Sequence, residues 1–163
     1  MRDIPAEKAN FSFGQGKLTA TPVQIAVMTS AIANGGNAPY PMLVRGTTEN
    51  IASYIPEAPE PVYSRACDSK TAEMLRSFME ETVIKENSAA IPDHCKAGGK
   101  TSTAQTGRFD ENGNEYLNCW FTGYFPAEAP EYAVTVLVEE GYTGNATAGP
   151  VFKEICNKIC KLS

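Results

Sequence analysis

Residues 98–125 run GGKTSTAQTGRFDENGNEYLNCWFTGYF, and this stretch decides the predicted fold. Its first part, up to Phe109, is an extended segment rich in small hydroxyl residues, and its last part, from Tyr116, is an aromatic-rich segment. The Asn112-Gly113 pair between them is a strong short-range signal for a hairpin turn. We therefore expect two antiparallel strands joined by a tight turn.

The pattern continues downstream with a second turn at residues 127–131 and a third strand at residues 132–140. Three consecutive strands joined by short turns predict an antiparallel meander. A last helix is expected to begin at Pro150, with an apolar stripe that can lie on the sheet. That stripe contains Val151, Phe152, Ile155, Cys156, Ile159 and Cys160.

Upstream, residues 19–36 give the clearest helix signal. Thr21 is a good N-cap, Pro22 suits the first helical position, and Gln24 completes a capping box. Two glycines, Gly35–Gly36, are expected to end the helix. Apolar residues occur on every side of it, which predicts burial all round. These residues are Val23, Ile25, Val27, Met28, Ala31 and Ile32.

Between the two helical regions the chain is rich in proline, and we expect irregular structure there with one short strand around Met42–Arg45. A second helix is predicted from about Ser69 to Val83. Five of its apolar residues fall on one face at helical spacing, which predicts that they pack into the core. They are Met74, Leu75, Phe78, Met79 and Val83.

The length, composition and charge of the chain limit the classes of protein to which it can belong. The 163 residues fit one domain, 42% of them are hydrophobic, and the formal net charge is −5. No basic patch stands out, so nucleic acid is a poor candidate partner. No apolar run is long enough to span a membrane, and the N-terminus has no signal-peptide core. The chain is expected to be soluble, either as it stands or as a piece of a longer exported protein.

The five cysteines are scattered, and no CxxC pair occurs among them. With a single histidine, His94, the chain has few residues for a zinc site, so no metal or organic cofactor is expected. Cys156 and Cys160 lie four residues apart on the apolar side of the last predicted helix. We expect buried thiols that behave as small hydrophobic groups, and no disulfide network.

Lys100 lies between two glycines and a row of hydroxyl residues, a setting that suits contact with an anionic ligand. A phosphate-binding P-loop is excluded, because that motif needs a glycine where this chain has His94. From local sequence alone, a solvated lysine at the start of a strand remains an alternative.

Four segments, in order, resemble the C-terminal part of the transpeptidase domain of class B penicillin-binding proteins. The first resembles a Phe-Gly-Gln-Gly segment with its buried helix, and the second resembles a Lys-Thr-Gly box. The third resembles the following aromatic strand, and the fourth resembles the last helix. They are FSFGQGKLTATPVQIAVMTSAIANGG (11–36), GGKTSTAQTG (98–107), CWFTGYFP (119–126) and AGPVFKEI (148–155).

The resemblance covers about residues 11–162 and implies an α/β (α+β) fold. This would be a partial penicillin-binding/serine β-lactamase-like fold, with an antiparallel sheet of about three strands, a C-terminal helix and a buried helical segment. All of residues 1–163 would form the C-terminal portion of the domain. Its helical part would span about 11–92, and its sheet and last helix about 96–162.

The family also implies a function, peptidoglycan cross-linking by serine acyl transfer, and a site that binds stem peptides and β-lactams. Lys100 would supply positive charge, Thr101 would offer its hydroxyl to the substrate carboxylate, and the backbone N–H of Thr103 would be an oxyanion donor. Ser102 would also contact the substrate, but it stands where the family most often has glycine, so β-lactam affinity is not carried over.

Two other family boxes, Ser-x-x-Lys and Ser-x-Asn, have no match, because no serine has lysine three residues later or asparagine two residues later. The nucleophile is therefore expected upstream, and this chain alone is predicted to be inactive. Its parent would be a serine-type D,D-transpeptidase anchored in the bacterial cell membrane, with its catalytic domain on the extracytoplasmic face. Its first partner would be the upstream half of its own catalytic domain.

Two other interpretations stay open. One is a non-catalytic accessory module that binds D-Ala-D-Ala peptides or a partner protein, and the other is a relative of the serine β-lactamases. If half of the domain is missing, an all-apolar helix and a sheet with an unpaired strand would expose apolar surface. The isolated chain is therefore expected to self-associate, to swap elements between copies or to be only marginally stable.

Overall fold

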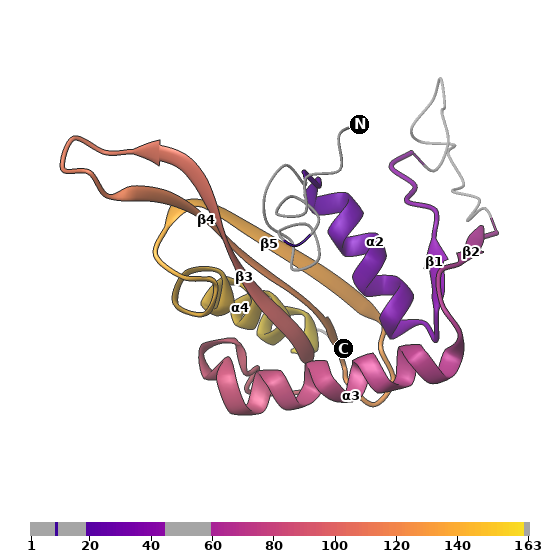
Figure 1. The fold of residues 1–163 in the computed structure, drawn as a ribbon. Helices are drawn as coiled ribbons and strands as arrows, with labels where there is room; N and C mark the ends of the chain where they lie inside the picture. The colour runs from indigo at the N-terminus through magenta and orange to yellow at the C-terminus, as the bar shows by residue number, and fades with distance from the viewer. Residues whose placement is uncertain (1–8, 10–18, 45–59, 162–163) are drawn as a thin grey trace, which may run out of the picture.

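The computed structural model describes Ala9, residues 19–44 and residues 60–161, and the Phe-Gly-Gln-Gly-like segment at 11–16 lies outside them. Helices α2 and α3 lie on one face of a three-stranded sheet, and helix α4 lies on the other (Figure 1). The described elements are α2 (Pro22–Ala33), β1 (Asn37–Pro39), β2 (Tyr63–Arg65), α3 (Ser69–Glu86), η2 (Ser88–Ala90), β3 (Gly98–Phe109), β4 (Glu115–Phe125), β5 (Tyr132–Gly141), η3 (Gly144–Ala148) and α4 (Gly149–Cys160).

The sheet has the order β3-β4-β5 with antiparallel neighbours, so the predicted meander is confirmed. Its first turn holds Gly113 at φ +83°, a conformation that favours glycine. Asp110 supports this turn by accepting hydrogen bonds from the backbone N–H groups of Asn112 and Asn114, both at 2.8 Å. The β3–β4 hairpin extends beyond the end of β5 (Figure 1).

On the α4 face, aromatic side chains form a closed core. The rings of Phe121 and Phe152 lie 4.5 Å apart between centroids, and the Phe125 ring meets Phe152 edge-on at 6.2 Å. All three side chains are fully buried, as is Cys156 on the next turn of α4. The predicted stripe is wrong for Val151, which is 43% exposed because it points about 100° away from Phe152 around the helix.

Helix α2 begins as predicted, with a reciprocal capping box. The backbone N–H of Gln24 donates to Thr21 Oγ1 at 3.2 Å, and the N–H of Thr21 donates to Gln24 Oε1 at 2.8 Å. The prediction of burial all round is wrong, since Val23 and Met28 are each about half exposed. Helix α2 packs on β4 and β5, and also on β1 and α3, but these contacts leave the two side chains partly exposed.

Helix α3 begins after Asp68, which caps it by accepting the N–H of Thr71 at 2.8 Å, and this hydrogen bond lowers the pKa of Asp68. The helix continues to Glu86, three residues beyond its predicted end. Met79 and Val83 are buried as expected. The rest of the predicted core stripe is wrong, because three of its side chains are exposed: Met74, Leu75 and Phe78.

Tyr124 anchors α3 to the sheet. Its hydroxyl donates to the carbonyl of Arg76 and lies 3.1 Å from Glu80 Oε1, and burial raises the pKa of this phenol. The guanidinium of Arg76 lies 5.7 Å from the centre of the same ring and donates to the carbonyl of Ala127 at 2.6 Å. The start of β3 is therefore held beside α3.

The short strand predicted around Met42–Arg45 is wrong. Residues 42–44 form no strand, and Arg45 lies outside the described residues. Pairing occurs earlier, where β1 lies antiparallel to β2, because Gly36 O accepts the N–H of Ala66 and brings the two segments together. None of the helices in the described ranges is long and apolar enough to cross a membrane.

Candidate functional site at the β3 edge

Strand β3 carries the four predicted site residues in one continuous run. In the described part of the chain, β3 pairs with β4 on one side only, so it is an edge strand. The register places Lys100 opposite Thr122 and Thr103 opposite Cys119. An edge strand keeps part of its backbone available for a ligand, as the predicted site requires.

The two glycines before the lysine are required by packing inside the protein. A Cβ atom on Gly99 would lie 2.6 Å from the ring of Phe121, and one on Gly98 would overlap the ring of Tyr124. The aromatic side chains of β4 that require these glycines are distant in sequence and give no local signal. Because both glycines are buried, they hold the following residue, Lys100, in a fixed position on β3.

Lys100 is exposed, and its Nζ atom lies 3.1 Å from the carbonyl oxygen of Thr101 and 3.4 Å from Thr101 Oγ1. It forms no ion pair with any residue in the described ranges. Its positive charge is therefore available to an external anion.

The other three residues alternate along the strand. Ser102 is exposed like Lys100, whereas Thr101 and Thr103 are half-buried and face η3. The N–H of Gly144 donates to Thr103 Oγ1 at 3.2 Å. This hydroxyl therefore holds η3 against the strand, and the side chain of Thr103 positions the backbone whose N–H was predicted to act as an oxyanion donor.

A chain of three hydroxyls lies on the face of the sheet opposite to Thr101 and Thr103, the same face as Lys100, and sequence reasoning missed it. Thr122, the strand partner of Lys100, lies 2.6 Å from Thr29 on α2 and 2.8 Å from Thr135 on β5, measured between Oγ1 atoms. Thr29 is fully buried. This chain fixes α2 to the sheet beside the candidate site, and its members are too far apart in sequence to give a local signal.

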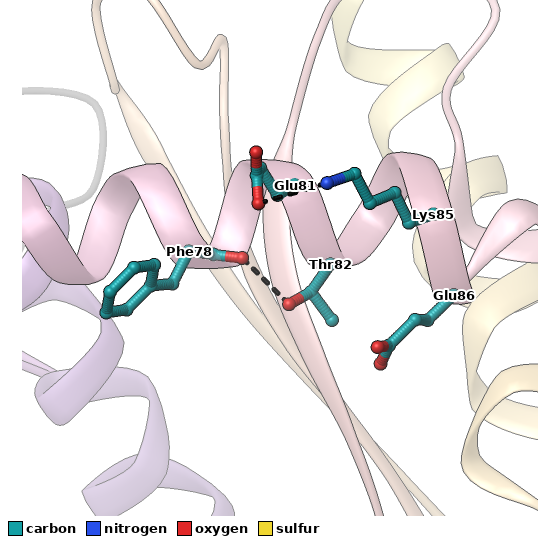
Figure 2. A pocket seen from close by; sticks show the side chains of 5 residues that line it. All are labelled: Phe78, Glu81, Thr82, Lys85 and Glu86. Carbon is teal, nitrogen blue, oxygen red and sulfur yellow. Dashed lines mark hydrogen bonds and ion pairs between the residues drawn. The ribbon is translucent and has the colours of Figure 1, made fainter.

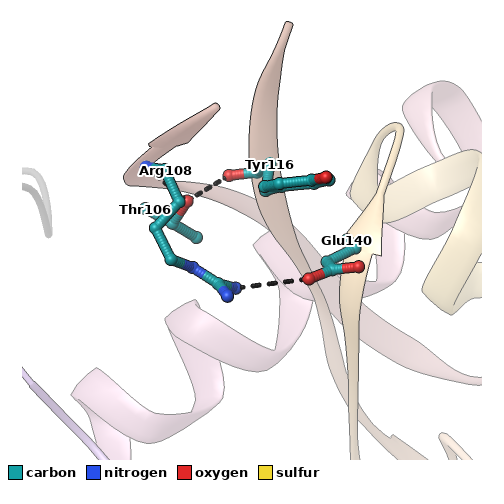
Figure 3. Close-up of polar contacts among 4 residues, drawn as sticks. All are labelled: Thr106, Arg108, Tyr116 and Glu140. Carbon is teal, nitrogen blue, oxygen red and sulfur yellow. Dashed lines mark hydrogen bonds and ion pairs between the residues drawn. The ribbon is translucent and has the colours of Figure 1, made fainter. Parts of the chain in front are cut away.

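Further polar contacts brace the outer part of the β3–β4 hairpin (Figure 3). The Thr106 hydroxyl donates to the carbonyl of Tyr116 at 2.5 Å. The guanidinium of Arg108 lies 5.6 Å from the centre of the Tyr116 ring and 3.6 Å from a carboxylate oxygen of Glu140. These contacts join the hairpin to the end of β5.

Two shallow hollows on the surface lie away from these residues. One, of about 250 Å³, lies along α3 and is lined by Phe78, Glu81, Thr82, Lys85 and Glu86 (Figure 2). The other, of about 260 Å³, lies between α2, the β1–β2 pair and the turn before β5. Neither hollow includes any of the four residues from Lys100 to Thr103. In the described ranges, no group of three or more His, Cys, Asp or Glu residues is arranged to hold a metal ion.

Comparison with known proteins gives a consistent assignment. The sequence profile of the penicillin binding protein transpeptidase domain matches residues 3–157. Stage V sporulation protein D of Bacillus subtilis is 28% identical over 160 residues, which is 93% of this chain and 24% of that protein. Peptidoglycan D,D-transpeptidase PbpA of Mycolicibacterium smegmatis is 32% identical over 148 residues, which is 86% of this chain and 29% of that protein.

Solved structures give the same result. The transpeptidase domain of Burkholderia pseudomallei penicillin-binding protein 3 superimposes with a TM-score of 0.77 at 27% identity, covering 99% of this chain and 47% of that one. PBPA from Mycobacterium tuberculosis gives a TM-score of 0.75 at 28% identity, covering 94% of this chain and 35% of that one. The predicted family and the partial penicillin-binding fold are confirmed. The chain spans about a quarter of the length of the curated relatives it matches.

Proposed function

Because the chain belongs to the penicillin-binding protein transpeptidase family, we propose that it forms the C-terminal portion of the catalytic domain of a peptidoglycan D,D-transpeptidase. Such an enzyme cross-links cell-wall stem peptides by serine acyl transfer, and β-lactams acylate the same serine. The observation that carries the proposal is the edge strand β3, which presents Lys100 without an ion-pair partner in the described ranges.

In this proposal the strand forms one wall of the acyl-transfer pocket. The Lys100 ammonium attracts the substrate carboxylate and stabilises negative charge that develops near the nucleophile. The Thr101 hydroxyl, already within 3.4 Å of that ammonium, donates to the same carboxylate. A preorganised positive charge in such a site is worth more than in water, because it needs no reorganisation during the reaction.

The oxyanion donor is the backbone N–H of Thr103. The hydrogen bond between the Thr103 hydroxyl and Gly144 keeps this part of the strand in place while charge develops on the substrate oxygen. Ser102, exposed beside it, contacts the ligand where the family most often has glycine. Its hydroxymethyl group would narrow the pocket or add a hydrogen bond.

The nucleophilic serine and its lysine base come from residues outside this chain, so the chain alone is inactive and its first partner is the upstream half of its own domain. The apolar side chains exposed on α2 and α3 support this assignment, because the upstream half would cover them. The complete protein would be membrane-anchored, with its catalytic domain on the extracytoplasmic face, where peptidoglycan cross-linking takes place.

The test is the rate at which a fluorescent penicillin labels the longer protein that contains this chain and its upstream residues. Lys100→Ala should slow acylation by about 100-fold or more, since it removes a charge that stabilises the transition state. Lys85→Ala, which removes an exposed lysine paired with Glu81 on α3, is the matched control and should leave the rate unchanged. Equal rates for Lys100→Ala and the unaltered protein would contradict the assigned role.

A further inference from the structure

Two of the five cysteines, which were expected to be buried thiols without a disulfide network, meet in space. The Sγ atoms of Cys95, in the segment before β3, and Cys160, in the last turn of α4, lie 2.7 Å apart. Both side chains are half-buried, and both thiols are free in this structure. The two sulfur atoms need to approach by less than about 1 Å to reach the length of a disulfide bond.

The backbone around Cys95 is held on both sides of the residue. On one side, Asp93 pairs with Lys153 Nζ at 2.6 Å and exchanges two 2.8 Å hydrogen bonds with the Asn157 side chain, so it is fixed to α4. On the other side, the carbonyl of Lys96 accepts the N–H of Ala127 at 2.8 Å. Cys95 therefore stays beside the helix end that carries Cys160.

We propose that Cys95 and Cys160 form a disulfide bond when the protein meets a low-molecular-weight disulfide oxidant. The inference is independent of the transpeptidase function, since it rests on the two thiols and on the contacts that hold them. A metal site at this place is not supported, because no cluster of three or more suitable ligands occurs in the described ranges.

The chemistry balances as two successive thiol–disulfide exchanges. Burial, together with the Cys160 thiol, raises the pKa of Cys95 to about 12, which disfavours Cys95 as the first attacking thiolate. The Cys160 thiolate attacks the oxidant, forming a mixed disulfide and releasing one thiolate, which takes up the proton of Cys95. Cys95 then attacks Cys160 Sγ and releases the second thiol. Two protein thiols and one oxidant disulfide give one protein disulfide and two small thiols.

The bond would join the end of α4 to the entry of β3. Cys95 precedes Lys100 by one short segment that includes the buried Gly98 and Gly99. A link that closes a long loop in a geometry the native fold already has should stabilise the protein. We expect Tm to rise by about 10 °C when the reduced chain is oxidised.

The experiment treats the purified, fully reduced 163-residue chain with oxidised glutathione, blocks the remaining thiols with iodoacetamide and digests the product with trypsin. The expected product is a linked pair of peptides, residues 86–96 and residues 159–161. Cys156 lies in a different tryptic peptide, residues 154–158, so the two possible pairings of Cys95 are distinguished. The intact mass, measured before the thiols are blocked, should fall by about 2 Da, because two hydrogen atoms leave.

Variants give the controls. Cys95→Ser and Cys160→Ser should each abolish the linked pair, whereas Cys67→Ser, which changes a half-buried cysteine between β2 and α3, should retain it. The proposal is overturned if both peptides are recovered separately with blocked thiols, if the link joins Cys156, or if only glutathione adducts form. An unchanged or lower Tm of the oxidised chain would also overturn it.

Discussion

The two faces of the sheet differ in how completely their apolar side chains are covered. On the α4 face, Phe152 is fully buried between two other aromatic rings. On the opposite face, α2 and α3 pack on the sheet through one side only, and Phe78 on α3 is 56% exposed. Both phenylalanines belong to apolar stripes at helical spacing, so the stripe alone does not determine burial.

The apolar side chains on the two faces are covered to different extents because the helices pack against different parts of the protein. One side of α4 faces β4 and β5, and aromatic side chains of β4 fill the space between them. The outer sides of α2 and α3 are covered less completely, and the side chains of Met28, Leu75 and Phe78 there are 51%, 38% and 56% exposed. An exposed apolar surface of this kind marks a place for another protein segment to bind.

The largest effect is expected when the ring of Phe152 is removed from the face of the sheet that carries α4. Phe152→Ala should lower the free energy of unfolding by about 3–5 kcal/mol, because it leaves a cavity beside two rings. Urea denaturation followed by circular dichroism measures this change. The matched control is Phe78→Ala, which should change stability by no more than about 0.5 kcal/mol. Similar losses for the two variants would show that the faces do not differ.

The face of the sheet that carries α2 and α3 exposes apolar side chains, and it should therefore also drive association between copies of the chain. Leu75→Lys combined with Phe78→Lys should weaken this association by about 2–3 kcal/mol, because two apolar side chains no longer leave water. Light scattering over a concentration series measures the change in molecular mass. Glu111→Lys, in the hairpin turn, alters the net charge by the same amount and should leave the association unchanged. A monomer at all concentrations without any substitution would contradict the prediction.

A smaller effect is expected for the hydroxyl chain of Thr29, Thr122 and Thr135, which lies beside the candidate site. Thr29→Val keeps the shape of the side chain but removes its hydrogen bond with Thr122, and stability should fall by about 1–2 kcal/mol. The neighbouring Ser30→Ala is the control, with an expected change within about 0.5 kcal/mol. Thermal and urea unfolding of both variants measure the difference, and equal losses would show that the hydroxyl chain does not hold α2.

The smallest effect is expected at Asp93, whose carboxylate is more than half exposed. Its hydrogen bond with Lys153 lowers the pKa of Asp93 below the ordinary value of 3.8. A depressed folded-state pKa contributes stability that is present above the unfolded pKa and is lost as the pH falls through the folded pKa.

Asp93→Asn should therefore destabilise the protein at neutral pH, and this deficit relative to the unaltered chain should shrink below about pH 4. Urea midpoints at several pH values measure it. Glu81→Gln, which breaks an exposed ion pair within α3, provides the comparison. A deficit that grows as the pH falls would contradict the assigned pKa shift.

Local chemistry explains which parts of the fold could be predicted from the sequence. The capping box of Thr21 with Gln24 and the turn at Asn112-Gly113 each depend on residues that are close in sequence, and both are present in the structure. The exposed positions on α2 and α3 could not be predicted in this way, because burial depends on which other segments cover a helix. Periodicity identifies an apolar face but does not reveal whether a partner is there.

The candidate site shows the same limit. The extended pattern and the turn at Asn112-Gly113 were enough to place Lys100–Thr103 on one strand. The chain from Thr29 through Thr122 to Thr135 and the contact between Cys95 and Cys160 had no sequence signal, because their members are far apart in the chain. The roles of the four strand residues in catalysis stay predictions.

The most direct test of the central claim compares covalent labelling by a fluorescent penicillin in two proteins. One is this 163-residue chain, and the other is the longer protein that adds the upstream residues. If β3 is one wall of a pocket whose serine lies upstream, the longer protein is labelled at an upstream serine and this chain is not labelled. Stoichiometric labelling of this chain alone, or no labelling of the longer protein, would contradict the account.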